Sequence, residues 1–385
     1  MSSTPYDFDT PVIRRGTGSM KWERYAGRDV LPMWVADMDF RSAPEIIAEL
    51  KDRADDGVFG YTIPYEEVIR EVLAYLARGH GIQASAADLV FTPGVVPALT
   101  LICQAYAGPG EGVMTATPVY PPFLTCVEAA GRALQAVPLR TDGRDRWTLD
   151  FDAMESAVMD STRLFIFCNP HNPVGRVYTR TEIDGLISFC ERHDLVLCVD
   201  DIHCDLILDD VRHVSVSSLG DSVAERCVTL NAPSKTYNLP GLACAYAVIS
   251  NPTLRARFQR AADKIITEIN AFGYTGCAAA YRHGEPWRRA LIDYLRGNRD
   301  LVYSYLGERV PEIRLRPMEA TYLAWLDVRA LSLDSPGRFF AEHGVGLSDG
   351  AAFAAPGYVR LNFGCPRSQL AEGLKRIESA VASTR

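Results

Sequence analysis

The stretch Cys227-Val228-Thr229-Leu230-Asn231-Ala232-Pro233-Ser234-Lys235 joins a short apolar run to a turn that carries a lysine. Apolar runs of this kind recur along the chain and are separated by segments with helical spacing; they are Asp88–Thr92, Gly112–Ala116, Leu164–Cys168, Leu195–Val199, Cys227–Leu230 and Ala243–Ile249. Such alternation is typical of a mostly parallel sheet covered by helices. The sequence therefore predicts an α/β fold.

Two helices are predicted in front of the first of these strands. Ser42 stands at an N-cap position, Pro44 follows in the first turn and Glu45 completes a capping box, so a helix is expected to run to about Asp56. Helical spacing returns over Tyr65–Arg78.

After Pro252 the pattern changes to longer helical stretches. Helices are predicted at Phe258–Glu268, Trp287–Glu308, Ser335–Glu342 and Arg367–Ala382, and strands at Thr321–Leu326 and Val359–Asn362. A chain of 385 residues exceeds what one hydrophobic core usually organises. We therefore expect the last part of the chain to form a second lobe.

Composition and charge narrow the class of protein. A formal net charge of −8 argues against a nucleic-acid binder, which needs clustered lysine and arginine. No stretch is long and apolar enough to span a bilayer, and Met1–Asp9 lacks the basic and apolar regions of a signal peptide. The ten cysteines are scattered without a CxxC pair. We expect buried free thiols in a cytoplasmic protein with no nucleic-acid or membrane partner.

Polar residues follow three of the predicted strands. Asn172 lies in a proline-rich loop after Leu164–Cys168, Asp200 and His203 follow Leu195–Val199, and Lys235 follows Cys227–Leu230. In an α/β sheet, ligands bind beyond the carboxyl ends of the strands. These side chains are therefore expected to face one crevice.

The residue types in that crevice indicate a cofactor. A lysine in a partly dry crevice has a lowered pKa and becomes a nucleophile toward aldehydes. A carboxylate from a neighbouring strand can keep a pyridine nitrogen protonated, which makes pyridoxal phosphate an electron sink. Lys235 and Asp200 suit these tasks, although Asp201 is also a strand-end carboxylate. His171 and His203 lack partners at metal-ligand spacing, so no metal site is expected.

The order of these motifs resembles a known family. Asn172-Pro173-x-Gly175, Asp200-x-x-His203 and Ser234-Lys235 are similar to the motifs of fold-type I, aminotransferase-like enzymes that depend on pyridoxal phosphate. The segments that resemble the cystathionine β-lyase (MalY/PatB) branch more narrowly are Trp34–Phe40, Gly57–Tyr61, Ala232–Thr236 and Val359–Arg367. Each motif is weak alone, but their correct order over the whole chain is specific.

The resemblance implies an architecture and an assembly. The fold would be that of fold-type I pyridoxal phosphate enzymes. Residues 49–284 would form a large domain with a mostly parallel seven-stranded sheet between helices, and residues 1–48 with 285–385 would form a smaller α/β domain. The enzyme would be a homodimer in which Tyr61 reaches the cofactor phosphate and the substrate of the partner's site.

The resemblance also implies which residues hold the cofactor ring. Lys235 would carry pyridoxal phosphate and later move the Cα proton, and Asp200 would pair with the ring nitrogen. Asn172 would hydrogen-bond the phenolate oxygen and lie beside the substrate. Tyr120 would stack on the ring and take part in catalysis with Lys235 and Asp200. His203 stands near the same oxygen, where many relatives carry a tyrosine.

Further positions would bind the phosphate and the substrate. Backbone amides at Val95 and Val96, at a predicted helix N-terminus, would receive the phosphate, with Ser234 as a side-chain contact. Arg360 would bind the substrate carboxylate, a task for a planar bidentate donor, in preference to Arg367. The chain departs from many aminotransferases in one respect, because Ala232 replaces a phosphate-binding serine.

The reaction implied by the branch is β-elimination from L-cystathionine or another L-cysteine S-conjugate, giving a thiol, pyruvate and ammonia. Transamination uses the same lysine, aspartate and arginine, so an aminotransferase remains an alternative. A specialised enzyme of secondary metabolism acting on a cysteine conjugate is another. The non-enzyme alternative is a regulatory protein that acts through surface contacts.

Overall fold

A seven-stranded sheet forms the centre of the molecule. The computed structural model describes residues 5–263, 265–266 and 268–384. The strand order is β2-β10-β9-β8-β7-β3-β4, with β2 Leu89–Thr92, β3 Gly112–Thr117, β4 Ala133–Pro138, β7 Thr162–Cys168, β8 Val196–Asp200, β9 Cys227–Asn231 and β10 Ala245–Val248. Strand β10 runs in the opposite direction to the other six strands of this sheet. The predicted mostly parallel sheet is confirmed.

Both faces of the sheet are buried, which explains why its strands are apolar runs. Along β7, Leu164 and Ile166 point into one hydrophobic cluster, whereas Phe165 and Phe167 point into another on the opposite face. The first cluster is covered by α4 Val95–Tyr106, α5 Pro122–Ala129 and α9 Pro252–Ala262. The second is covered by α6 Phe151–Ala157 and α7 Arg180–Arg192, with α8 Asp221–Ala224 at its edge.

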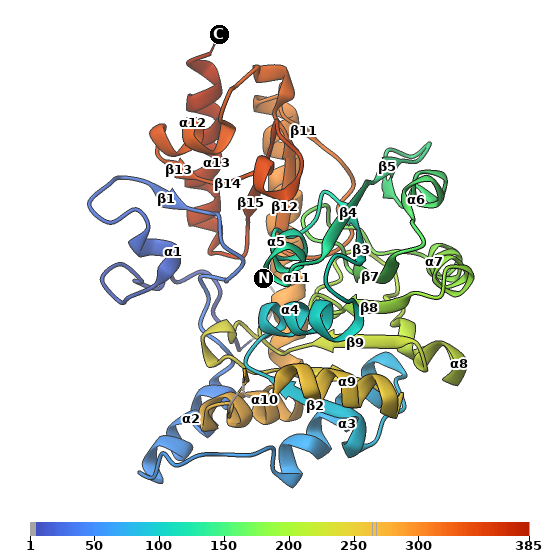
Figure 1. The fold of residues 1–385 in the computed structure, drawn as a ribbon. Coiled ribbons are helices and arrows are strands. Elements are labelled where there is room, and N and C mark those ends of the chain that lie inside the picture. The colour runs from blue at the N-terminus through green and yellow to red at the C-terminus, as the bar shows by residue number, and fades with distance from the viewer. Residues whose placement is uncertain (1–4, 264, 267, 385) are drawn as a thin grey trace.

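The C-terminal part of the chain contains a smaller antiparallel sheet, and we refer to this part as the second lobe. Its strand order is β11-β12-β15-β14, with β11 Arg314–Leu315, β12 Leu323–Asp327, β14 Ser348–Asp349 and β15 Tyr358–Asn362. The helices of this part are α11 Glu285–Arg309, α12 Pro336–Glu342 and α13 Arg367–Ala382. Figure 1 shows α12 and α13 in its upper part, whereas α11 runs from there down through the middle of the view, at the level of the large sheet.

The N-terminal segment pairs with a strand of this second lobe. Strand β1 (Leu31–Pro32) pairs in parallel with β13 (Val345–Gly346), and the short helix α1 (Met20–Glu23) precedes it. Figure 1 shows this blue segment beside the red C-terminal elements. The chain then crosses to the lower edge of the view, where α2 Pro44–Asp55, α3 Glu66–His80 and α10 Ala271–His283 lie together.

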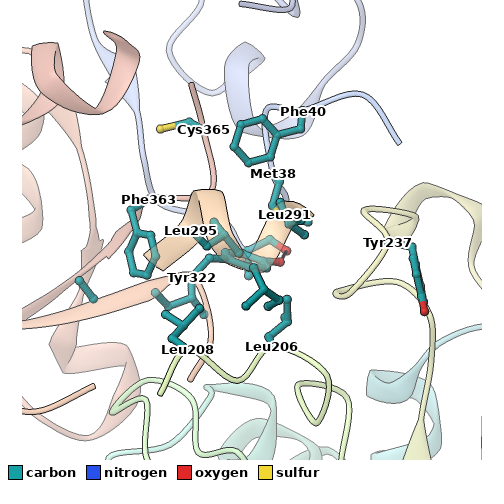
Figure 2. Packing of buried hydrophobic residues seen from close by; sticks show 14 of the residues in the cluster. Met38, Phe40, Leu206, Leu208, Tyr237, Leu291, Leu295, Tyr322, Phe363 and Cys365 are labelled. Carbon is teal, nitrogen blue, oxygen red and sulfur yellow. Dashed lines mark hydrogen bonds between the residues drawn. The ribbon is translucent and has the colours of Figure 1, made fainter. Parts of the chain in front are cut away.

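A single hydrophobic cluster joins these distant segments around α11. Figure 2 shows Leu291 and Leu295 of α11 next to Met38 and Phe40 from the N-terminal segment. From other parts of the chain, the cluster also contains Leu206, Leu208, Tyr322, Phe363 and Cys365. The position of the N-terminal segment is therefore fixed by core packing.

Some of the predicted elements were wrong in detail. Helix α2 begins at Pro44, but its N-cap is Ala43 without a side-chain hydrogen bond, because the Ser42 hydroxyl donates instead to the carbonyl of Asn238. The helix predicted over Phe258–Glu268 is α9, which ends at Ala262; Lys264 and Thr267 lie outside the described residues. Strand β4 and helix α10 were not predicted.

The predicted division of the chain stays a prediction. Its boundary at residues 48 and 49 falls inside α2, and its boundary at residues 284 and 285 coincides with the start of α11. A short hairpin of β5 (Arg140–Thr141) and β6 (Trp147–Thr148) lies outside both main sheets.

The structure also bears on the apolar and cysteine patterns. Over the residues that the structure describes, no helix combines the length and apolar character needed to cross a bilayer. All ten cysteines are buried and free of disulfides, as the sequence predicts.

Replacing Leu295 by alanine tests whether the core around α11, which joins segments distant in sequence, stabilises the fold. Leu295 is fully buried, so Leu295→Ala removes packed methyl groups and leaves a cavity. We expect the free energy of unfolding in urea to fall by about 2–5 kcal/mol. The control is Arg289→Ala on the exposed face of the same helix, which we expect to change it by less than about 0.5 kcal/mol. Equal effects of the two changes would contradict this role.

Candidate active site

The ends of neighbouring strands bring the predicted residues to one edge of the large sheet. Asn172 and Lys235 follow β7 and β9, and Asp200 is the last residue of β8, which lies between these two strands and parallel to both. Strand β2 runs in the same direction as β9, because both are antiparallel to β10. The loop after β2 therefore opens at this same edge and leads into α4.

Two adjoining cavities lie at this edge, and Ala36, Tyr120 and Lys235 line both. The inner cavity, of about 260 Å³, is lined on the sheet side by Val95, Val96, Asn172, Asp200, His203 and Ser234. The outer cavity, of about 730 Å³, reaches to Arg360 and to the N- and C-terminal segments. All predicted site residues except Tyr61 line one of the two cavities.

Lys235 lies where the two cavities meet. Its Nζ donates a hydrogen bond to the carbonyl oxygen of Ala36 at 2.8 Å. Part of the side chain borders open cavity, but the amine itself is withdrawn from bulk water. This desolvation, with the charge of Arg360 as a smaller cause, lowers the pKa of Lys235 to about 8. At pH 7 about one tenth of the amine is therefore uncharged, which is more than a hundred times the fraction for a solvated lysine.

Asp200 is the carboxylate that faces the inner cavity. Burial raises its pKa to about 7, while a hydrogen bond from the Ile202 amide at 3.1 Å acts in the opposite direction. The neighbouring Asp201 is turned away and is held by the Ser215 hydroxyl at 2.6 Å and by His213 at 3.2 Å. Asp201 therefore has a structural environment, and Asp200 has the one that can receive a ligand.

Arg360 lies on β15 of the second lobe and faces the site. Its Nη1 donates to Oδ1 of Asn172 at 3.0 Å, and its Nη2 donates to the carbonyl of Trp34 at 2.9 Å. Its Nε is buried without a partner among the described residues, and no carboxylate pairs with it there. Burial lowers its pKa to about 10. By contrast, Arg367 is bound to Asn298 and lines neither cavity.

His203 and Tyr120 complete the walls of the inner cavity. His203 is 2% exposed and its Nδ1 has no partner among the described residues. Burial, with Lys235 and Arg360 nearby, lowers its pKa to about 3, so the ring is neutral. Tyr120 is half-buried, its amide donates to the carbonyl of Asn172 at 3.0 Å, and burial raises the pKa of its hydroxyl.

The start of α4 provides an anion-binding end to the inner cavity. The N-cap is Gly94, with φ +147°, and no side chain caps this 12-residue helix. The first amides of a helix have no partner within it. Those of Val95 and Val96 are therefore free to attract an anion, and Ser234 lines the same cavity.

Tyr61 is the predicted site residue that one chain does not bring to the cavities. Its side chain is 95% exposed in the loop before α3, and it lines neither cavity. Its expected contact would have to come from a second subunit. That role stays a prediction.

The donor set of the inner cavity fits pyridoxal phosphate. It combines a nucleophilic amine, a carboxylate for a ring nitrogen, free helix amides for a phosphate and a flat aromatic side chain. The unpartnered Nδ1 of His203 and the Asn172 amide add polar groups in its wall. These groups are what a flat, anionic ligand with one aldehyde carbon requires.

Some features of the site were not predicted. The Ala36 carbonyl accepts hydrogen bonds from Lys235 and, at 3.0 Å, from the hydroxyl of the buried Tyr322. The Trp34 carbonyl accepts from Arg360. These acceptors belong to the backbone, so residue type gives no signal for them, although both lie in the Trp34–Phe40 motif.

The chain is similar to known enzymes over nearly its whole length. The family model "Aminotransferase class I and II" matches residues 28–377. Cystathionine beta-lyase PatB of Bacillus subtilis is 38% identical over 98% of this chain and 100% of its own.

Two solved structures extend this likeness to the fold. The crystal structure of OvoB is 40% identical with a TM-score of 0.95 and covers 98% of this chain and 100% of its own. Cystalysin from Treponema denticola, described as containing a pyridoxal 5'-phosphate cofactor, is 31% identical with a TM-score of 0.94, over 99% and 100% of the two chains. The chain thus belongs to the aminotransferase class I and II family and has the fold-type I architecture of pyridoxal phosphate enzymes.

Proposed function

We propose that this protein is a pyridoxal phosphate dependent carbon–sulfur β-lyase that cleaves L-cystathionine or another L-cysteine S-conjugate. The observation that carries the proposal is the position of Lys235 between two cavities. The inner cavity suits the cofactor, and the outer one, which contains Arg360, has room for an amino acid with a long side chain. The likeness to cystathionine beta-lyase PatB supports this reaction type.

The residues of the inner cavity would hold the cofactor by the groups they present. Lys235 would bind its aldehyde carbon and Asp200 its ring nitrogen, whose positive charge would keep the carboxylate ionised despite burial. Asn172 and the neutral His203 would lie at the ring oxygen, and Tyr120 would lie against the ring. The amides of Val95 and Val96 would receive the phosphate, together with Ser234.

The side chains of the outer cavity prepare the substrate for proton removal. The bound cofactor supplies an electron sink for the negative charge that develops at Cα. Arg360 binds the substrate carboxylate with its fork of donors and so fixes the orientation of Cα. The uncharged form of Lys235 takes the Cα proton as general base. Cleavage of the Cβ–S bond releases the thiolate into the outer cavity. Hydrolysis of the remaining three-carbon fragment by water then gives pyruvate and ammonia.

A homodimer is part of the proposal. The loop before α3 exposes several large apolar side chains, namely Val58, Phe59, Tyr61 and Ile63. Contiguous exposed apolar residues mark interaction surfaces. In the dimer, Tyr61 would reach the phosphate in the partner's site and supply the contact that Ala232 cannot. The ten buried free thiols support placement in a reducing cytoplasm.

Product analysis separates the lyase from the aminotransferase alternative. With L-cystathionine and water we expect homocysteine, pyruvate and ammonia in equal amounts, because elimination breaks the Cβ–S bond and hydrolysis releases the amine. Thiol, pyruvate and ammonia are measured in parallel with a reaction containing alanine and a keto acid. Formation of a new keto acid without thiol or ammonia would support an aminotransferase instead. A protein inactive with both substrates would favour a specialised conjugate or the regulatory role.

Arg360→Lys tests the carboxylate contact. A lysine keeps a positive charge but loses the bidentate fork, so we expect kcat/KM for cystathionine to fall about 10–100-fold. The matched control is Arg367→Lys, which lies outside both cavities and should keep kcat/KM within about threefold. The visible absorbance of bound cofactor should survive both changes. A larger effect at Arg367 than at Arg360 would refute the assignment.

The lowered pKa of Lys235 predicts a pH profile for cofactor binding. Only the uncharged amine attacks an aldehyde, and its fraction grows as pH rises through the pKa of about 8. The rate at which apoprotein recombines with pyridoxal phosphate should therefore rise from pH 6.5 and level off above about pH 9. Stopped-flow absorbance measures this rate, and Lys235→Arg should abolish the covalent phase. A rate that still climbs toward pH 10 would show a solvated, unperturbed lysine.

A further inference from the structure

The mouth of the outer cavity carries three arginines. Arg24 and Arg28 come from the segment between α1 and β1, and Arg338 comes from α12. All three are exposed. This local positive charge contrasts with the net charge of −8 of the whole chain. Lys235 lines the same cavity, so a substrate side chain that extends from Lys235 toward solvent can approach these exposed arginines.

Aromatic rings hold two of these arginines in place. The guanidinium carbon of Arg24 lies 4.4 Å from the ring centre of Trp34. The ring of Tyr25 contacts both cations, with its centre 5.9 Å from the guanidinium carbon of Arg24 and 5.8 Å from that of Arg28. Stacking leaves the edge of a guanidinium, where its N–H donors lie, open to a ligand.

No protein carboxylate neutralises Arg24 or Arg28 within the part of the chain that the structure describes. Among the described residues lining the outer cavity, Asp349 is the one acid. Its two oxygens already accept hydrogen bonds from the amides of Gly337 and Ala351, at 2.8 and 2.9 Å. Arg338 has only a 3.9 Å contact with Glu342, an exposed pair of little strength.

Trp34 contacts both Arg24 of this arginine group and Arg360, which binds the substrate carboxylate in the proposed reaction. The carbonyl of Trp34 accepts a hydrogen bond from Arg360, and its ring supports Arg24. Its indole N–H donates to the carbonyl of Lys21 at 3.1 Å, which fixes the ring. One anchored residue thus sets the separation between the arginine for the α-carboxylate and the arginine at the far end of the cavity.

We infer that the outer cavity selects cysteine S-conjugates whose departing thiol carries a carboxylate, which binds Arg24 and Arg28. The inference rests on the proposed lyase function and names the class of its substrate. The α-carboxylate meets Arg360, and the distal carboxylate meets the paired arginines at the mouth. Thiols with neutral alkyl ends gain no such charge-assisted hydrogen bonds.

A pair of matched substrates tests the inference with the holoenzyme. S-(3-carboxypropyl)-L-cysteine has the reach of cystathionine and a distal carboxylate, and S-(3-carbamoylpropyl)-L-cysteine has the same shape without the charge. We expect kcat/KM to favour the carboxylate about tenfold at low ionic strength. The preference should shrink toward twofold in 0.5 M salt, because screening weakens partly exposed ion pairs.

The double variant Arg24→Gln/Arg28→Gln assigns the preference to these side chains. We expect it to raise KM for the carboxylate substrate about tenfold, with kcat within twofold and with kcat/KM for the amide substrate nearly unchanged. Arg260→Gln, an exposed arginine on α9 that lines neither cavity, is the matched control and should leave both substrates unaffected. If the two arginines had only a structural role, the double variant would lower kcat/KM for both substrates equally.

The outcomes separate this inference from the proposed function. The arginine subsite would be overturned, and the lyase left intact, if thiol were released from both conjugates with no preference for the carboxylate. The same would hold if the preference survived in the double variant. No thiol from either conjugate or from cystathionine would overturn the lyase itself and the subsite with it. Loss of the carboxylate preference in the double variant alone is the result that the inference requires.

Discussion

The site depends on the two hydrogen bonds that the carbonyl oxygen of Ala36 accepts. This oxygen accepts hydrogen bonds from Nζ of Lys235 at 2.8 Å and from the Tyr322 hydroxyl at 3.0 Å, so it joins the N-terminal segment, the loop after β9 and the second lobe. A buried network holds this segment, because Asp39 accepts from Lys21 and from Arg14, both at 2.7 Å. The amine of Lys235 is therefore fixed by groups distant in sequence.

Withdrawal from water gives the crevice its chemical character. Burial is the largest cause of three shifts: the pKa of Lys235 is lowered to about 8, that of Asp200 is raised to about 7 and that of His203 is lowered to about 3. The anionic phosphate of a bound cofactor would meet the amides at the start of α4, and its protonated ring nitrogen would meet Asp200. The arrangement therefore favours the ligand over water, and the Arg360 clamp adds selectivity for an amino acid.

The sequence predicted most of the sheet and the side chains of the site, because buried strands are continuous apolar runs with polar residues at their ends. It missed β4, an edge strand that is partly exposed. It also missed α10, whose Gly273 lies where a Cβ would approach the Leu242 carbonyl to 2.7 Å, so close packing requires a residue that weakens a helical pattern. Backbone acceptors such as Ala36 depend on tertiary packing alone.

The central claim is that Lys235 carries the cofactor, and the most direct test is to locate the attachment site. The purified protein is reduced with borohydride, digested and analysed by mass spectrometry. The account predicts a pyridoxyl-phosphate group on the peptide that contains Lys235, and loss of this adduct and of the yellow absorbance in Lys235→Ala. An adduct on a different lysine, or unchanged labelling of the variant, would contradict it.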